Sequence, residues 1–407
     1  MTAGNTAASF GWVARSLHWA TALLILVAIP LGVYANGMAF DTEAELAAKA
    51  QLFSVHKTLG VAAFLVAVMR ILWALTQPRP HPLHPDRKLE TTVAETVHWV
   101  LYISLVVVPL SGWVHHAAVS GFAPILWPFG QTLPFVPKSE SIGAFAGALH
   151  WVFTNLLAAS ILLHVLGALK HHLIDRDNTL RRMTRGVAEK AEAIRNAAPG
   201  TSHILPFVLA VALYAAGAGL AAALVASEVT DATESAESAG SMPAEVAGNW
   251  QVVEGTLAFT VRQMGQEVPA SFAKWTADIT FDETATDGRH GTVVVRIDTG
   301  SLTLGSVTDQ AKGKDFFDTS TFPEALFRAD LLSATDGYIA TGTLSLRGAD
   351  VPVSLPFTLT IDGDRATMKG TARLDRRDFG MGQAYGDEAT VGFFADVSVD
   401  LVAERKK

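Results

Sequence analysis

The chain has 407 residues, of which 50% are hydrophobic and 17% are charged, and its mean hydropathy is +0.29. This composition is too apolar for a soluble protein of that length, and the length itself suggests two or three domains. The net charge of −8 gives no support to a nucleic-acid partner, and the absence of cysteine excludes disulfides, cysteine-ligated iron–sulfur clusters and covalent c-type haem attachment.

Five apolar stretches are long enough to cross a membrane. The first follows an N-terminal segment with a single arginine, and no small-residue cleavage site follows the apolar run, so we interpret it as a retained span and not as a signal peptide. The last carries no charge, and its small residues suit either close helix packing or simple anchoring. The predicted spans are 17–36, 52–76, 97–118, 142–174 and 204–226.

Lysine and arginine are unevenly distributed between the two sets of loops that these spans define. One set holds only Lys49, Lys57 and Lys138. Because cytoplasmic loops carry the excess of positive charge, the other set belongs inside. We therefore expect a cytoplasmic N-terminus and, after five spans, a C-terminus outside the cytoplasm. The basic set comprises Arg15, Arg79, Arg87, Lys88, Lys170, Arg176, Arg181, Arg182, Arg185, Lys190 and Arg195.

The stretch HWVFTNLLAASILLH, residues 150–164, has a histidine at each end of an apolar helical segment. An ionisable side chain at membrane depth is costly and by default marks a functional site. Fourteen residues of α-helix rise about 21 Å and return to within roughly 40° of the starting face. His150 and His164 therefore lie on nearly one face, each near one side of a bilayer core about 30 Å thick.

Depth along the spans groups four histidines into two pairs, with His18 and His164 on the inner side and His56 and His150 on the outer side. Two histidines at one depth on neighbouring helices can clamp one planar metal macrocycle, and histidine is a standard axial ligand of haem iron. Hydrogen-bonded packing, a proton relay and a zinc site remain alternatives, and His98 competes with His18 on the inner side. Interfacial anchoring is the commoner explanation for the span-end residues His115, His116, His171 and His172.

The C-terminal part of the chain has a different composition. Residues 227–246 are rich in Ser, Ala, Glu and Thr and predict a flexible linker. From 247 to 404, short runs such as TLAFTV and TVVVRID alternate apolar and polar residues and are separated by Gly, Asp and Pro. This pattern predicts an all-β domain of barrel or sandwich type.

Four motifs in order resemble the bacterial cytochrome b561 family: SLHW at 16–19, SVHKTLG at 54–60, the HW that opens span four, and LLHVLGALKHH followed by DNTLRRM. The resemblance covers about residues 8–185; a basic cytoplasmic linker at 186–203 and an anchoring fifth helix at 204–226 follow. It implies a membrane four-helix di-haem bundle in the bacterial inner membrane.

The same resemblance implies which residues bind the cofactors. His18, His56, His150 and His164 match the axial ligands of two non-covalent b-type haems, and membrane quinone is the implied redox partner. Arg70, in VMRILW, matches an arginine of the second span that either pairs with a haem propionate or snorkels to the interface.

Residues 247–404 resemble a second family, the YceI-like domains, in FTVRQMG, VRIDTGSL, KDFFDTSTFPEALFRA, GTLSLRGADVPVSL and RLDRRDFGMG. The resemblance implies a periplasmic, lipocalin-like barrel whose apolar interior binds an isoprenoid, a quinone-like compound or a similar amphiphile, since a wide barrel leaves a cavity inside. The candidate cavity or rim residues, any of which could instead be plain core, are Phe259, Val261, Met264, Phe316, Phe317, Phe322 and Phe327.

This β-domain departs from the family pattern at polar positions. Residues 254–256 replace an Asp and a His-Ser pair, Gln263 replaces a frequent His, and Thr308 replaces a frequent Arg. The head-group contacts of the family are therefore altered, and the ligand can differ. His290, in the turn DGRHG, is expected to be solvated.

Two functions fit these observations. The first is a membrane di-haem cytochrome that transfers electrons between membrane quinone and a donor or acceptor at the outer face, with oxidation of superoxide as one variant. The second is a membrane-anchored isoprenoid carrier in which the helices serve mainly as an anchor. An anchor needs one span and no paired histidines, so a reduced-minus-oxidised visible spectrum discriminates between them.

Overall fold

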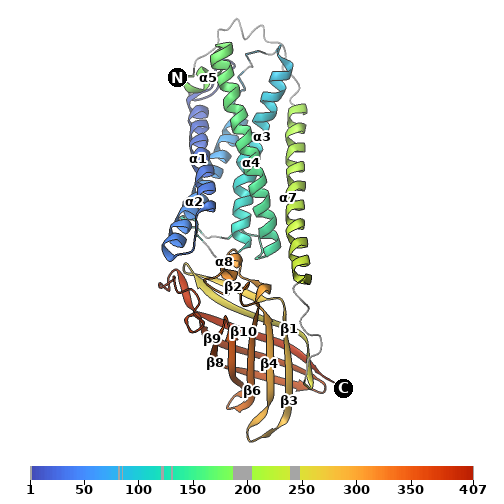
Figure 1. The fold of residues 1–407 in the computed structure, drawn as a ribbon. Helices are drawn as coiled ribbons and strands as arrows, with labels where there is room; N and C mark the ends of the chain where they lie inside the picture. The colour runs from blue at the N-terminus through green and yellow to red at the C-terminus, as the bar shows by residue number, and fades with distance from the viewer. Residues whose placement is uncertain are drawn as a thin grey trace. The chain divides into compact units, whose positions relative to one another are not determined.

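The computed structural model describes residues 2–80, 83–84, 86–120, 123–129, 132–186, 204–238 and 248–406. Within them the chain divides into a helical unit and a β-unit (Figure 1). The helical unit contains five helices that are long and apolar enough to cross a membrane, which confirms the five predicted spans. These helices are α1 (Trp12–Gly37), α2 (Glu43–Leu75), α3 (Lys88–Ala118), α4 (Glu140–Lys170) and α7 (Ile204–Ser238).

Helix α4 has a defined start and an unusual end. Ser139 caps its first turn by accepting a hydrogen bond from the backbone N–H of Ile142. At the other end the helix widens into a π-helical turn, η1 (His171–Asp175), which stops at Arg176 in the left-handed conformation, and the short helix α5 (Thr179–Thr184) follows. This exit places His171, Asp175 and Asp177 beside His84, Arg87 and Glu90 at the start of α3.

The four N-terminal spans do not pack evenly. Helices α3 and α4 lie closely against each other, and among the described residues no other two of the four helices approach closely over a comparable length. Where neighbouring helices do not pack closely, the bundle has room between them for flat cofactors, and helix bundles commonly hold cofactors in this way.

Helix α7 packs against the bundle and is therefore more than an anchor. Ala210, Tyr214 and Ala221 are buried in one cluster with side chains of α3 and α4. The Tyr214 hydroxyl hydrogen-bonds to Ser104 and to the backbone oxygen of Val100. The small residues of this span thus allow close helix packing, as one of the two sequence interpretations predicted.

Most of the residues in the two expected linkers lie outside the described part of the chain. The basic linker at 186–203 lies outside the described residues except for Gly186. Helix α7 continues to Ser238, so helix replaces the first part of the flexible linker expected at 227–246. The remainder of that linker also lies outside the described residues.

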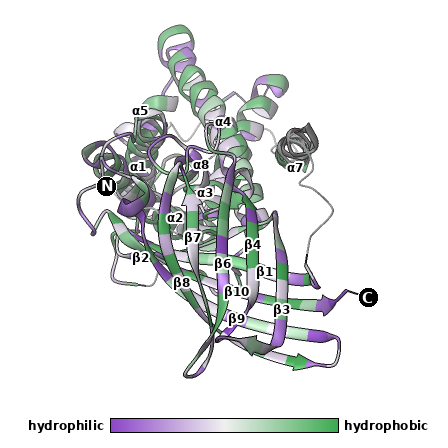
Figure 2. Cartoon of the chain, turned by 60° about the horizontal axis from the view of Figure 1, so that its bottom comes forward, coloured by the Kyte–Doolittle hydropathy of each residue, from purple (hydrophilic) through white to green (hydrophobic). Residues whose placement is uncertain are grey.

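The β-unit is a closed antiparallel barrel, as predicted. Eight strands form the ring in the order β1-β3-β4-β6-β7-β8-β9-β10, and β10 pairs back onto β1. Along the strands, hydrophilic and hydrophobic residues alternate (Figure 2), so that one side of each strand faces the interior. The ring strands are β1 (Trp250–Gln263), β3 (Trp275–Thr286), β4 (Arg289–Asp298), β6 (Glu324–Ala334), β7 (Gly337–Leu346), β8 (Ala349–Asp362), β9 (Arg365–Asp375) and β10 (Val391–Arg405).

Strand β1 has two neighbours on its second edge. Its start meets β3 through the pair Trp250 and Ile279, and its second half pairs with β2 (Gln266–Phe272). Strand β2 in turn pairs with the short β5 (Leu302–Thr303). The single turns η2 (Thr299–Ser301), α8 (Thr308–Lys312) and η3 (Arg376–Phe379) complete the unit.

His290 is not solvated, and that expectation was wrong. The side chain is only 8% exposed and stacks on Phe281, while its Nδ1 lies 2.7 Å from the backbone oxygen of Asp282 and its Nε2 lies 2.9 Å from Ser333 Oγ. A backbone oxygen can only accept, so Nδ1 carries a proton and donates it. The turn sequence suggested exposure, but β4 begins at Arg289 and turns the ring inward.

Candidate functional site

Two histidine pairs lie in the helical unit. The first pair is His18 with His164, and the second pair is His56 of α2 with His150 of α4. The ring centres of the second pair lie 6.2 Å apart, with the ring planes at 83°. His56 Nδ1 donates to the backbone oxygen of Ala28, and His150 Nδ1 donates to that of Val108, each over 2.9 Å. A neutral imidazole that donates from Nδ1 keeps a free lone pair on Nε2, and this is the tautomer that a metal ligand requires.

The two rings of the second pair are held in the same way, by a backbone carbonyl and a glycine of the facing helix. Ala28 and Gly32 lie four residues apart in α1, and Val108 and Gly112 lie four residues apart in α3, so each carbonyl shares a helix face with a glycine. A Cβ on Gly32 would lie 2.7 Å from the His56 ring, and one on Gly112 would lie 2.9 Å from the His150 ring. In each case the carbonyl orients the ring and the glycine makes room for it.

His18 of α1 and His164 of α4 form the first pair, with ring centres 6.2 Å apart and planes at 61°. Given a metal–nitrogen bond of about 2.0 Å and a ring centre about 1.1 Å behind the nitrogen, two imidazoles on opposite sides of one metal have centres about 6.2 Å apart. Both pairs match this spacing. His98 of α3 lies 5.1 Å from His164, which is too close for two axial ligands of one iron.

Arg70 of α2 lies beside the first pair. Its Nη2 is 3.2 Å from His18 Nδ1, and its guanidinium lies over the ring of Tyr102 at 5.5 Å. A guanidinium can only donate, so His18 accepts at Nδ1 and a neutral ring then carries its proton on Nε2. For Nε2 of His18 to bind a metal, Arg70 must release this contact, and an acidic group beside the ring would attract it away.

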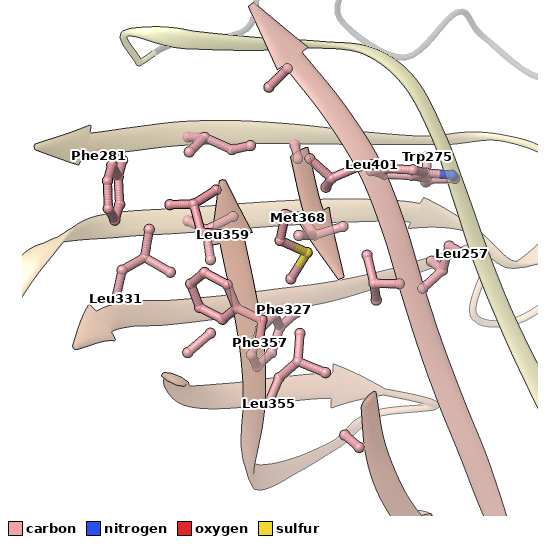
Figure 3. A pocket seen from close by; sticks show the side chains of 18 of the residues that line it. Leu257, Trp275, Phe281, Phe327, Leu331, Leu355, Phe357, Leu359, Met368 and Leu401 are labelled. Atoms are coloured by element: carbon pink, nitrogen blue, oxygen red, sulfur yellow. The ribbon is translucent and has the colours of Figure 1, made fainter. Parts of the chain in front are cut away.

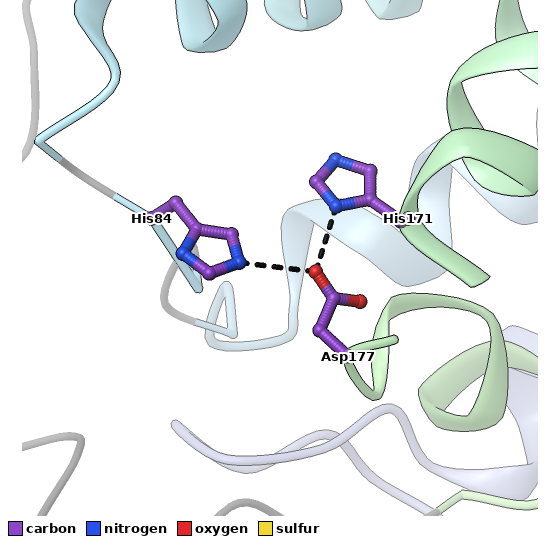
Figure 4. Close-up of side chains that lie close together, drawn as sticks. All are labelled: His84, His171 and Asp177. Atoms are coloured by element: carbon purple, nitrogen blue, oxygen red, sulfur yellow. Dashed lines mark hydrogen bonds and ion pairs between the residues drawn. The ribbon is translucent and has the colours of Figure 1, made fainter. Parts of the chain in front are cut away.

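A third cluster lies where α4 ends, and the sequence did not predict it. His171 Nδ1 and His84 Nε2 lie 2.7 Å and 3.0 Å from the same oxygen, Oδ2 of Asp177 (Figure 4). Burial acts to raise the pKa of Asp177, but hydrogen bonds from Thr179 and from both histidines outweigh burial and lower this pKa from 3.8 to about 2. Sequence reasoning treated His171 as an interfacial anchor and gave His84 no role. The signal available to it was a carboxylate six residues after a histidine at a span end.

The barrel encloses two neighbouring cavities. The first has a volume of about 180 Å³, and the side chains that line it are aromatic or aliphatic (Figure 3). The second, also of about 180 Å³, shares with the first the lining residues Leu257, Ile297, Leu344, Leu374 and Val397. The two cavities therefore abut, and together they form an elongated apolar space.

Five of the seven predicted cavity residues line these two cavities. Phe327 lines the first, and Phe259, Val261, Phe316 and Phe317 line the second. The other two line neither cavity: they are Met264, which lies in the turn between β1 and β2, and Phe322, whose ring packs near Gly348.

One buried polar atom in the second cavity has no hydrogen-bond partner. Gln263 is only 5% exposed, lines this cavity, and leaves its Oε1 unsatisfied. Of the other polar residues in the lining, Arg376 donates to five backbone carbonyls and Gln310 donates to Tyr385. Buried polar groups are rarely left unpaired, so Gln263 offers the second cavity an acceptor that the protein itself does not satisfy.

Comparison with known proteins gives two matches, one for each unit. Residues 9–186 match the family model of prokaryotic cytochrome b561. Residues 249–403 match the YceI-like domain. These limits agree closely with the two regions that the motifs indicated.

Individual relatives cover one region each. Cytochrome b561 homolog 2 of Escherichia coli is 28% identical over 185 residues, which is 45% of this chain and 95% of that protein. The probable superoxide oxidase CybB of Yersinia pestis is 27% identical over 169 residues, which is 41% of this chain and 90% of that protein. Among solved structures, BcnA of Burkholderia cenocepacia is 28% identical, with 36% of this chain and 95% of that chain covered and a TM-score of 0.34.

The cytochrome b561 match implies b-type haem and membrane electron transfer, and the two histidine pairs have the spacing and, in the second pair, the tautomer that haem ligation requires. The β-unit has the closed barrel and the apolar interior of a lipocalin-like fold. The chain therefore joins a region that matches the prokaryotic cytochrome b561 family model to a barrel that matches the YceI-like domain model.

Proposed function

We propose that the helical unit binds two b-type haems, one between His56 and His150 and one between His18 and His164. The observation that carries this proposal is that two separate histidine pairs have the same ring spacing of 6.2 Å. When bound, each haem iron carries one electron by cycling between its ferric and ferrous states.

The residues around the pairs have separate tasks in this proposal. The carbonyls of Ala28 and Val108 hold the second pair in one tautomer and raise the basicity of Nε2. Arg70 supplies a positive charge beside the first pair, where it would hold a haem propionate and free His18 for ligation.

Two pairs, one near each side of the span region, suit electron transfer across the membrane. Likeness to a probable superoxide oxidase supports superoxide as the outer donor, and membrane quinone is the acceptor that we propose. The balanced reaction is two superoxide ions, one quinone and two protons giving two dioxygen molecules and one quinol, so the two electrons pass one at a time. The distribution of Lys and Arg supports the bacterial inner membrane with a cytoplasmic N-terminus and a periplasmic barrel.

The haem proposal is tested by a pyridine haemochrome assay on the purified full chain. We expect two non-covalent b haems per polypeptide. His56→Ala and His150→Ala should each remove or disturb the same haem, because each change takes away one of its two imidazole ligands and so weakens its retention. His115→Ala is the matched control, since this histidine also donates to a helix carbonyl, that of Gly143, but belongs to neither pair. A wild-type chain with one haem or none contradicts the di-haem proposal, and a chain with no haem favours the membrane-anchored carrier.

For the barrel we propose that it binds an isoprenoid or quinone-like amphiphile. Two abutting apolar cavities support a long apolar tail, and the unsatisfied Gln263 supports a polar head at the end of the second cavity. A primary amide offers its oxygen to a hydroxyl and, after rotation, its N–H to a carbonyl, so one residue can serve both a quinone and a quinol.

Native mass spectrometry tests the barrel proposal. Expressed from about residue 245, the domain is expected to fold and to retain or take up an isoprenoid quinone, because apolar burial at roughly 25 cal/mol per Å² makes a long tail a strong anchor. An empty domain that ignores added isoprenoids would instead make the barrel a protein-interaction module.

A further inference from the structure

The cluster at the exit of α4 brings together side chains from two separated segments. His84 precedes α3, while His171 belongs to η1 and Asp177 follows that turn. One nitrogen of each histidine and one oxygen of the carboxylate all lie within 4.8 Å of one another. The two rings are stacked, with planes at 4° and centres 6.0 Å apart, so both present a nitrogen to the same point (Figure 4).

The oxygens of Asp177 have different partners. Oδ1 accepts the backbone N–H of Thr179 at 2.8 Å, which fixes the carboxylate, whereas Oδ2 alone faces the two histidines. In a tetrahedral site with bonds of about 2.0–2.1 Å, neighbouring ligand atoms lie about 3.3 Å apart. The observed separations of 2.7 Å and 3.0 Å would therefore need to open by about 0.3–0.6 Å.

The surroundings of His171 also fit a metal ligand. Its second nitrogen, Nε2, lies 3.3 Å from Oε1 of Glu90. Metal-binding histidines characteristically donate their other N–H to a carboxylate, which orients the ring and raises its basicity. Glu90 thus has the position of an outer carboxylate behind a ligating imidazole.

Charge near the cluster favours an added cation. The carboxylates of Asp175 and Glu90 pair with the cations Arg87 and Lys170, whereas Asp177 pairs, within the described part of the chain, only with the two histidines, so one negative charge among these residues is not matched by an arginine or lysine. Both cations are engaged with Asp175 and Glu90, so neither competes for Oδ2 of Asp177.

We propose that His84, His171 and Asp177 form a binding site for a divalent transition-metal ion, with zinc as the best match. Two imidazoles and one carboxylate suit zinc and its neighbours, whereas calcium and magnesium prefer sites built of oxygen alone. Three protein ligands leave a fourth position for water. The bound ion ties the segment between α2 and α3 to the exit of α4 and stabilises the folded chain by mass action.

Elemental analysis after equilibrium dialysis tests this site. The holoprotein, produced without a histidine tag and stripped with EDTA, is dialysed against low-micromolar zinc. We expect one zinc per polypeptide in the wild type and an affinity at least about tenfold weaker in His84→Ala and in the near-isosteric Asp177→Asn. Haem content is measured on the same samples, so that loss of zinc with haem retained identifies loss of this site and not of the fold.

His172→Ala is the matched control, because His172 is exposed and adjoins His171 in the same turn but takes no part in the cluster. It should keep its zinc. The proposal is overturned if the wild type binds no zinc under these conditions, or if His172→Ala loses zinc as completely as His84→Ala does. In either case the cluster is a hydrogen-bonded clamp at the helix exit.

Discussion

The candidate sites of the helical unit and of the barrel are made of different kinds of side chain. In the bundle, the candidate site consists of rare side chains in apolar surroundings: two histidine pairs and an arginine, and hydrogen bonds orient three of the four histidines. In the barrel, it consists of ordinary Leu, Val, Phe and Ala side chains, and the informative residue is a single unsatisfied glutamine. Under the two proposals above, the first unit would hold a cofactor by directed bonds, and the second would hold the apolar tail of a ligand by burial.

This difference determines how each unit should respond to mutation. A directed bond is lost completely when one atom is removed, so single substitutions in the bundle should have all-or-none effects on cofactor content. Burial is shared among many contacts, so single substitutions in the barrel should have graded effects. The substitutions below test the all-or-none response expected of the bundle and the graded response expected of the barrel.

The largest effect is expected at the first pair. His18→Ala and His164→Ala should each remove one of two haems, so that haem content falls by about half, because both rings have the spacing required at one iron. His98→Ala should keep both haems, since its ring is too close to His164 to share an iron with it. Pyridine haemochrome assays and visible spectra measure the outcome. Loss of a haem in His98→Ala, together with two intact haems in His18→Ala, would assign the ligand to His98.

A smaller effect is expected where glycine makes room for the second pair. Gly32→Ala and Gly112→Ala place a methyl group 2.7 Å and 2.9 Å from the rings of His56 and His150. Overpacking of this kind typically costs about 1–3 kcal/mol and should tilt the ring, which shifts the potential and spectrum of one haem without removing it. A redox titration followed by visible absorption measures the shift.

Gly60→Ala in α2 is the control for these variants, because nothing lies within 4 Å of the added Cβ. It should leave both potentials unchanged and raise helix stability by about 0.5–1 kcal/mol. Equal shifts in Gly60→Ala and Gly32→Ala would mean that the close approach of the glycine to His56 has no special role.

The predictability of the bundle follows from its rare residues. His18, His56, His150 and His164 stood out because ionisable groups in apolar spans need an explanation, and their depth follows from span position alone. Their hydrogen-bond partners could not be predicted, since a backbone carbonyl has no sequence signal. The segments AIPLG at 28–32 and VPLSG at 108–112 did carry a signal, a Pro and a Gly inside a helix, which marks a place where a backbone must be approached closely.

The features that could not be predicted from the sequence depend on contacts between residues far apart in the chain. His84 and Asp177 are 93 positions apart, and no local pattern connects them. In the barrel, the alternating strands predicted the fold, but Met264 and Phe322 are of the same residue types as true lining residues and differ only in where the turns place them. His290 was misjudged for the same reason, because its turn predicts exposure while the buried site formed by Phe281, Asp282 and Ser333 depends on register.

The smallest effect, and the one that separates burial from directed bonding inside the barrel, is expected at Gln263. An unsatisfied buried polar group costs about 1–3 kcal/mol, so Gln263→Leu should stabilise the empty barrel and raise its Tm by several degrees. The same change removes the partner of a polar head, so a quinol should bind more weakly while a plain hydrocarbon chain of equal length should bind as before. Gln310→Leu is the matched control: it lines the same cavity but removes an amide that already donates to Tyr385, and it should therefore destabilise the empty barrel. Thermal unfolding with and without each ligand measures both quantities. If Gln263→Leu lowers the Tm as Gln310→Leu does, the Gln263 amide has a partner within the protein, and the polar head of the ligand must be bound elsewhere.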